Sequence, residues 1–213
     1  GYPAVTRGGL TESGEIIGWS QHSVALYWWS SATGWLPMQV PTGATRCQVN
    51  DAINNLGAIA ARCSIAGNPS DGYYWQNRDA TPILLPRPSG TGDVWVWDIN
   101  DAGVIVGYLY GKSVRAVKWT PNGSGYTVSF LPDLGVKSAA YSIAQDGTVS
   151  GEVNRRTNSP RPALWSPTGD LILLGLLSNG NWGEAMNVTV TSTGLVAVGT
   201  QSNQTAVRWV VGR

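Results

Sequence analysis

The sequence predicts an all-β fold, a five-bladed β-propeller, because two markers recur at one period and no helical pattern accompanies them. One marker is a turn glycine before a short apolar strand: Gly14, Gly57, Gly103, Gly147 and Gly194. The other is a tryptophan that closes a β-rich segment: Trp28, Trp75, Trp119, Trp165 and Trp209. Both markers return about every 45 residues, as blades of four strands require. No segment of ten or more residues has an apolar period of 3.6, so little or no helix is expected.

The third unit illustrates the four antiparallel strands expected in each blade. Residues 94–99, rich in Val, Trp and Ile, form the first and innermost strand. A turn at residues 100–103 follows, because Asn and Asp bond to their own backbone and Gly103 can take a positive φ. The other three strands are expected at residues 104–108, 115–119 and 126–131.

The period distinguishes a propeller from a linear β-solenoid. A four-stranded blade needs about 40–50 residues, whereas a solenoid coil repeats in about 20–30. A single domain over residues 1–213 is therefore expected, with units at approximately 5–46, 47–92, 93–138, 139–181 and 182–213. Small residues suit inner strands that crowd toward an axis, and they occur at Gly8, Gly9, Ala52, Ala139, Ala140 and Ala185.

The fifth unit stops at Arg213, just after its third strand. Three outcomes are open: residues 1–5 supply a fourth strand, the last blade has three strands, or another copy of the chain donates a strand. An exposed sheet edge pairs readily with other strands, so a homo-oligomer is one of the expectations.

Composition limits the classes of partner. Charged residues make up 13% of the chain and the formal net charge is +1, which gives no electrostatic basis for binding nucleic acid or an anionic membrane. No apolar run approaches the roughly 20 residues of a membrane-spanning helix. Low charge with 27 Gly and 11 Trp is typical of secreted all-β proteins. A secreted or cell-surface location is expected, with a signal peptide absent from this numbering or already removed.

The two cysteines, Cys47 and Cys63, have two interpretations. They are either buried apolar thiols or a disulfide across a hairpin whose turn lies at residues 54–57. The strand register places them within about one position of facing each other, which favours the disulfide. Such a bridge would close a loop of about 15 residues and contribute roughly 3 kcal/mol in the chain-entropy model.

The units resemble the HAF-type extracellular repeat of bacterial proteins, whose inner strand ends in a turn like INDAG before VVG and AFLW. The stretches that carry the resemblance are WDINDAGVIVG at 97–107, YYWQN at 73–77, and PALWSP at 162–167. The resemblance covers nearly the whole chain, and it is weakest in unit two, which has Ala61 at the strand-two glycine, and in unit five. It implies a secreted or surface β-propeller-like protein without an established activity. A looser architectural likeness is to the five-bladed sugar-binding lectins of the tachylectin type.

Residues for catalysis or for a cofactor are sparse. The chain has one histidine, His22, in a loop setting that does not suit a Ser-His-acid triad. Neither a metal site nor a phosphate-binding glycine loop is indicated, so no catalytic residue, metal or cofactor is expected. The carboxylates nearest the axis are Asp51, Asp98 and Glu184, and a pair of them could serve glycoside hydrolysis. No long loops surround them to build a substrate cleft.

Aromatic residues outside the repeated position are the candidate ligand-binding groups. Trp95 and Trp97 point the same way along an inner strand, and the counterparts of Trp97 in other units are Gly8, Asp51, Tyr141 and Met186. This bulk either compensates for small residues in neighbouring units or forms an aromatic platform for a sugar. Equivalent strand-two positions hold Trp19, Arg62, Tyr108, Glu152 and Thr200. The candidate ligand-binding set is Trp95, Trp97, Asp98, Trp19, Tyr108, Trp182 and Glu184.

These observations predict a non-catalytic extracellular binding or surface-interaction module. The expected partner is a glycan, held at aromatic sites between blades or at the axis, or another extracellular protein. The first alternative is an assembly protein that joins copies through an unpaired edge strand. The second is a glycoside hydrolase with axial carboxylates.

Overall fold

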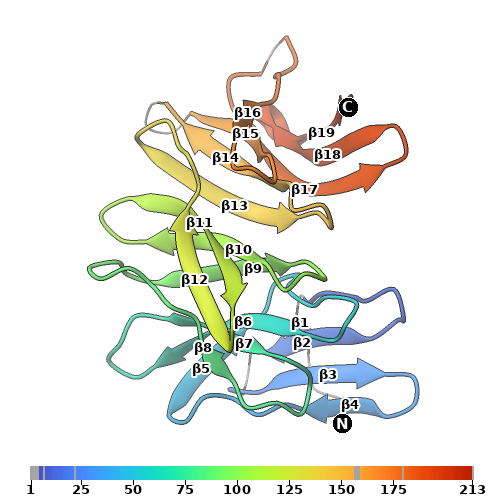
Figure 1. Ribbon diagram of the computed structural model, residues 1–213, viewed down its shortest axis with the longest axis vertical. Helices are drawn as coiled ribbons and strands as arrows, with labels where there is room; N and C mark the ends of the chain where they lie inside the picture. Colours follow the sequence, from blue (N-terminus) through green and yellow to red (C-terminus); the bar gives the residue numbers. More distant parts are fainter. Residues whose placement is uncertain (1–4, 7, 22, 156–158, 179, 213) are drawn as a thin grey trace.

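A computed structural model describes residues 5–6, 8–21, 23–155, 159–178 and 180–212. Its elements are β-strands and one short 3-10 helix, η1 (Ser202–Gln204), so the all-β prediction is confirmed for this part of the chain. The strands form five antiparallel sheets, of which the first two lie side by side at one end of the long axis and the third, fourth and fifth follow toward the other end (Figure 1). None of the helical segments described is long and apolar enough to cross a membrane.

Each sheet is a meander in which sequential strands are neighbours. The first sheet contains β1 (Val5–Thr6), β2 (Ile16–Ser20), β3 (Leu26–Ser30) and β4 (Gly34–Pro37). The second contains β5 (Ala44–Gln48), β6 (Ile59–Ile65), β7 (Asp71–Trp75) and β8 (Ile83–Leu84). The third contains β9 (Val94–Ile99), β10 (Ile105–Tyr110), β11 (Val114–Asn122) and β12 (Gly125–Phe130), close to the four strands predicted for this unit.

The fourth sheet contains β13 (Lys137–Ile143), β14 (Val149–Asn154), β15 (Pro160–Trp165) and β16 (Leu171–Leu173). The fifth contains three strands, β17 (Gly183–Thr191), β18 (Gly194–Gln201) and β19 (Thr205–Val211). Val5 and Thr6 pair with β2 inside the first sheet. The fifth sheet of this one chain therefore has three described strands, while residues 1–4 lie outside the described residues.

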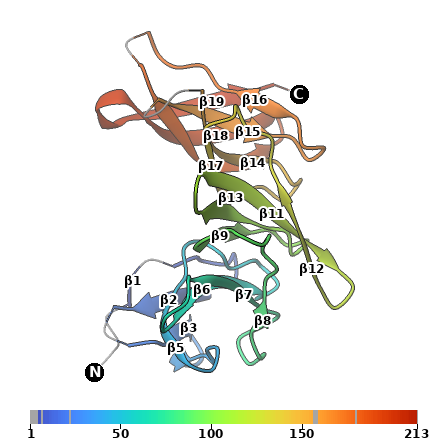
Figure 2. The same cartoon turned by 90° about the vertical axis from the view of Figure 1, so that its left-hand side faces the viewer.

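The five sheets form an open array. The first and second sheets lie at one end of the molecule and the fifth at the other, in both views (Figures 1 and 2). The hydrophobic core lies between successive sheets in three clusters, the first spanning sheets one to three and the others joining sheet three to four and four to five. The blade-like sheets are thus confirmed, but closure of the ring is not seen.

The repeated tryptophans attach each sheet to the one before it. Trp75, Trp119 and Trp165 are fully buried, as expected for packing between blades. Each indole Nε1 donates a hydrogen bond to a carbonyl that follows the fourth strand of the preceding sheet. The pairs are Trp75 to Gln39 at 2.9 Å, Trp119 to Pro86 at 2.7 Å, Trp165 to Pro132 at 2.8 Å and Trp209 to Gly175 at 2.6 Å.

The strand register corrects the position of the shared tryptophan in the first unit. Trp119 pairs with the residue two positions before Gly107 of its sheet. The residue that pairs two positions before Gly18 in the first sheet is Trp29, and not Trp28 as the spacing suggested. Because neighbouring residues of a strand point to opposite faces, Trp28 projects toward the second sheet instead, where its ring approaches Gly57.

Polar residues of the recurrent turn form a second set of links between sheets. Asn54 accepts hydrogen bonds from the N–H groups of its own turn, and its Nδ2 donates to Asn100 O at 3.0 Å. Asn100 repeats the arrangement with Ala144 O, at 3.2 Å. The Asn that the second and third units share in this turn is thereby explained by structure, since its side chain closes the turn and reaches the next sheet.

Cys47 and Cys63 lie directly opposite each other on β5 and β6 and form a disulfide, which confirms the second interpretation of the pair. The described part of the chain contains no free cysteine. Disulfides persist mainly in oxidising compartments, so the bridge is consistent with a secreted or periplasmic protein.

Candidate functional site

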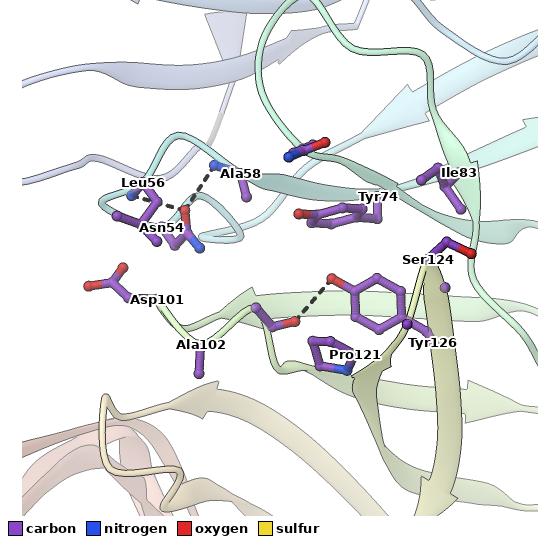
Figure 3. A pocket seen from close by; sticks show the side chains of 14 residues that line it. Asn54, Leu56, Ala58, Tyr74, Ile83, Asp101, Ala102, Pro121, Ser124 and Tyr126 are labelled. Atoms are coloured by element: carbon purple, nitrogen blue, oxygen red, sulfur yellow. Dashed lines mark hydrogen bonds between the residues drawn. The ribbon is translucent and has the colours of Figure 1, made fainter.

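A pocket of about 470 Å³ opens between the second and third sheets (Figure 3). Tyr74 of β7 and Tyr126 of β12 line it from the two sheets, with Ile83 of β8 beside them. The turn residues Asn54 and Asp101 line its other end. Two neighbouring sheets therefore supply an apolar wall and a polar wall to the same cavity, which is the usual arrangement in small-molecule sites.

The two tyrosines make the aromatic wall of the pocket. Their ring centroids are 5.1 Å apart and their planes meet at 60°, an edge-to-face contact. Tyr126 donates its hydroxyl hydrogen to Gly103 O at 3.1 Å (Figure 3). Burial, followed by the neighbouring Tyr74, raises the pKa of Tyr126. The Tyr126 hydroxyl therefore stays neutral and its ring is fixed against the third sheet.

Hydrogen bonds fix the polar wall as well. Asp101 accepts from the backbone N–H of Asn55 at 2.8 Å and from its Nδ2 at 3.2 Å. By contrast, the side chains of Gln76 and Ser124, which also line the pocket, make no hydrogen bond to any described residue. They leave donors and acceptors available to a ligand with hydroxyl groups.

Several of the aromatic residues predicted as ligand-binding groups gather near the inner strands, where they pack against one another. The rings of Trp95 and Tyr108 stack with centroids 5.7 Å apart and planes at 17°. Arg62 of the second sheet places its guanidinium carbon 3.4 Å from the centroid of Trp95. Trp97 meets Tyr141 edge-on at 5.0 Å. Trp97 and Tyr141 occupy equivalent positions, as the sequence predicted, because each is the extra residue at the bulge of its inner strand.

The remaining predicted residues occupy separate places. Trp19, on β2 of the first sheet, lies under the guanidinium of Arg46, 5.2 Å from its ring centroid. Trp182 precedes β17, and its carbonyl accepts a hydrogen bond from Ser202 N at 3.2 Å. His22 lies outside the described residues. The structure therefore brings Trp95, Trp97 and Tyr108 together but not Trp19 or Trp182.

Glu184 belongs to a carboxylate pair at the junction of the fourth and fifth sheets. Desolvation, and then the Glu152 carboxylate, raise the pKa of Glu184. Glu152 is 1% exposed, and Lys137 Nζ lies 2.5 Å from its Oε1. The ammonium group compensates part of the charge that burial would otherwise leave uncompensated. These three charged groups connect the fourth sheet to the fifth, so the cluster can stabilise this junction without any ligand.

Asp98 and Asp51 both line a second hollow, of about 410 Å³, near the inner ends of the sheets. Asp98 accepts hydrogen bonds from Ser142 Oγ at 2.8 Å and from Ile143 N at 2.9 Å, both in the fourth sheet. Burial raises the pKa of Asp98 to about 7, against the effect of these bonds. Glu184 does not line this hollow. In the described chain, no group of three or more His, Cys, Asp or Glu side chains is arranged to hold a metal ion.

The pocket between the second and third sheets was not predicted from the sequence. Tyr74 stands inside the YYWQN stretch, which was used only for the resemblance to the extracellular repeat. The sequence does contain a signal for this pocket, at the position before the shared tryptophan, whose side chain points to the next blade. The residues at this position are Trp28, Tyr74, Lys118, Leu164 and Arg208. An aromatic residue there, opposite a tyrosine in the following blade, marks the site.

Comparisons with known proteins define a fold class. No family model and no curated protein sequence matches the chain. The chain is similar to the solved structure of TolB from Acinetobacter baumannii, with 13% identity and a TM-score of 0.63 over 98% of this chain and 55% of that chain. It is also similar to virginiamycin B lyase from Staphylococcus aureus, with 9% identity and a TM-score of 0.59 over 97% of this chain and 70% of that one.

A third likeness is to a gluconolactonase from Xanthomonas campestris, at 12% identity and a TM-score of 0.57, over 92% of this chain and 69% of that one. At these identities the likenesses establish the fold alone. The chain has a β-propeller-type fold, and it spans about half the length of TolB. Solved structures of this fold include a calcium-binding protein, regucalcin from Agrobacterium tumefaciens, as well as the two enzymes.

Proposed function

We propose that the chain is a non-catalytic, extracytoplasmic binding module whose ligand is a carbohydrate. The observation that carries the proposal is the pocket between the second and third sheets, where Tyr74 and Ile83 face hydrogen-bonding groups across about 470 Å³. A sugar has a flat apolar face of C–H groups and a rim of hydroxyls. An aromatic wall suits the first and the free side chains of Gln76 and Ser124 suit the second.

The location is part of the same proposal. The disulfide between Cys47 and Cys63 supports an oxidising compartment, since such bridges are rare in reducing ones. Glycans are abundant outside the cytoplasm, so compartment and ligand class agree.

Titration with neutral oligosaccharides tests the ligand class. Maltotriose, cellotriose and chitotriose would be added to the isotopically labelled protein while amide and side-chain shifts are followed by NMR. We expect shifts at Gln76 and Ser124 for at least one sugar, and a loss of affinity of at least about tenfold in Tyr74→Ala, because stacked aromatic area dominates such contacts.

The matched control is Tyr110→Ala. Tyr110 is 55% exposed and lines a different, smaller hollow on the third sheet, so its removal should leave sugar affinity unchanged. Equal losses in the two variants, or shifts confined to residues outside the pocket for every sugar, would contradict the proposal.

The axial aromatic cluster of Trp95, Trp97 and Tyr108, with Asp98 and Glu184 near it, is the second place at which a sugar could bind. The observation in its favour is that Trp97 Nε1 is buried and makes no hydrogen bond of good geometry to a described residue, although the Tyr108 hydroxyl lies near it. A ligand hydroxyl could accept from it. Trp97→Phe separates the two places: a sugar at the axis loses affinity in this variant, whereas one in the Tyr74 pocket does not.

A further inference from the structure

We propose that the ligand is a linear glycan that occupies two equivalent pockets at successive sheet junctions. This inference rests on the proposed function, to which it adds a second binding site and the polymeric nature of the ligand. The second pocket, of about 360 Å³, opens between the first and second sheets, and Trp28 and Ser30 line it from the first sheet. It is called the Trp28 pocket below.

The repeat establishes that the two pockets are equivalent. Counted from the shared tryptophan of each sheet, Trp28 corresponds to Tyr74 and Ser30 corresponds to Gln76. Five further positions line both pockets. The residues at these positions, with that of the Trp28 pocket first, are Glu15 and Ala58, Asn55 and Asp101, Gly57 and Gly103, Asn77 and Pro121, and Asp79 and Gly123. The Trp28 pocket is therefore the Tyr74 pocket one unit earlier in the chain.

Leu56 connects the two pockets, because it lines both of them. It is 73% exposed, although it is a large apolar residue. The equivalent turn positions of the other units hold Ser13, Ala102, Asp146 and Thr193. A ligand that passes from one pocket to the other covers this leucine and removes its apolar surface from water.

Hydrogen bonds between the turns hold the two pockets at a fixed spacing. Asn55 Oδ1 accepts from Glu12 N at 3.0 Å, and Asp101 Oδ1 accepts from Asn55 N at 2.8 Å, so the same contact recurs at both junctions. Packed sheets lie about 10 Å apart, which sets the scale of this spacing. A ligand with repeated units gains from such a pair of sites, because its second unit binds at a high effective concentration once the first is in place.

The two pockets offer different contacts to a sugar. Trp28 is 5% exposed, so little of its ring reaches the cavity, and the rim beside it is polar. Asn77 and the ion pair of Arg78 with Asp79, at 3.0 Å, belong to this rim. The Tyr74 pocket has Pro121 at the position of Asn77. Hydroxyl groups of one glycan unit therefore suit the Trp28 pocket, and the apolar face of another unit suits the Tyr74 pocket.

A length series of sugars tests the inference. Isothermal titration calorimetry would give the affinities of the disaccharides and hexasaccharides of the maltose, cellulose and chitin series. For a series that binds, we expect the hexasaccharide to exceed the disaccharide by at least about thirtyfold in affinity, at one ligand per chain. A single pocket would gain from length only a few-fold, from the larger number of registers in which a longer chain can bind.

Three variants at one position of the repeat locate this gain. Ser30→Tyr places a ring in the Trp28 pocket and should lower hexasaccharide affinity by at least about tenfold, and with it the ratio of hexasaccharide to disaccharide affinity. Gln76→Tyr places the ring in the Tyr74 pocket and should weaken the disaccharide as well. Thr120→Tyr is the matched control, because the equivalent Thr120 is exposed and lines neither pocket.

Leu56→Ser keeps the inference testable if a tyrosine variant does not fold, since it changes only an exposed side chain. It should weaken the hexasaccharide more than the disaccharide. An unchanged affinity ratio in both Ser30→Tyr and Leu56→Ser, or two hexasaccharides bound per chain, would overturn this inference and leave the Tyr74 pocket as a sugar site. Absence of binding for every sugar of either length would instead contradict the proposed function, and this inference with it.

Discussion

At the scale of the residue, the shared tryptophan position packs against a neighbouring sheet in one blade and lacks that contact in another. The Trp119 indole is completely buried and hydrogen-bonded to Pro86 O, whereas the indole of Trp29 at the equivalent position has no such partner among the described residues. The same residue therefore contributes differently to the free energy of unfolding in the two blades, because its contribution comes from contacts with the preceding sheet.

Trp119→Phe measures this difference. The change leaves Pro86 O without its donor and a small cavity beside it, so we expect a loss of at least about 2 kcal/mol in the free energy of unfolding. Trp29→Phe is the matched control and should cost less than about 1 kcal/mol, since no hydrogen bond is lost. Urea denaturation followed by circular dichroism gives both values, and equal losses would show that the interface does not decide the energy.

Asp98 should make stability depend on pH. Its pKa is raised to about 7 in the folded chain and is about 3.9 when unfolded, so the folded state holds a proton that the unfolded state releases between these values. The free energy of unfolding should therefore fall as pH rises from about 4 to about 7, by up to about 4 kcal/mol, and then level off.

Asp98→Asn should remove this slope, as measured by urea midpoints at pH 4.5, 6 and 8. Ser142→Ala is the informative companion, because it removes a donor that favours the ionised carboxylate. It should raise the pKa of Asp98 further and extend the decline to higher pH. A slope that persists in Asp98→Asn would assign it to other groups.

At the scale of the element, the strand-two glycine and the bulge of the inner strand depend on each other. A Cβ at Gly107, Gly151 or Gly199 would collide with a carbonyl oxygen of the inner strand, at the point where that strand bulges. Only glycine fits so close an approach. The second sheet has Ala61 at this position. Its inner strand is also irregular there, because its pairing with β6 is interrupted between Gln48, which lies opposite Arg62, and Ile53, which lies opposite Ile59.

Gly151→Ala tests the contact between the strand-two glycine and the bulge. The added methyl group would meet the Ala139 carbonyl oxygen, so the inner strand must move, and we expect a loss of about 3 kcal/mol or more. Ala61→Gly places the common residue in the exceptional sheet and should cost only about 1 kcal/mol, from backbone entropy. Thermal unfolding distinguishes them, and a tolerated Gly151→Ala would mean that the bulge is not fixed by this contact.

At the scale of the whole molecule, the features that repeat along the chain could be predicted from the sequence. The features that depend on contacts between particular sheets could not. The period, the four strands of the third unit and the facing of Cys47 and Cys63 follow from local residue patterns, and the structure has all three. The pocket beside Tyr74 depends on which side chains two sheets turn toward each other, and its two tyrosines are 52 positions apart in the chain. The open ends were not predictable either, because a period counts blades but does not say whether the first and last of them meet.

An open array should be least protected at its ends. The third sheet has a neighbour on both sides, whereas the fifth has one, and in such arrays stability is nearly a sum of each unit and its interfaces. Amide hydrogen exchange followed by mass spectrometry should therefore be slowest for β10 and β14 and at least tenfold faster for β18 and β19. The length of β18, Gly194–Gln201, makes this a strict comparison, because strand length alone would give β18 the greater protection. Uniform exchange over all five sheets would instead mean that the terminal sheets are covered in solution.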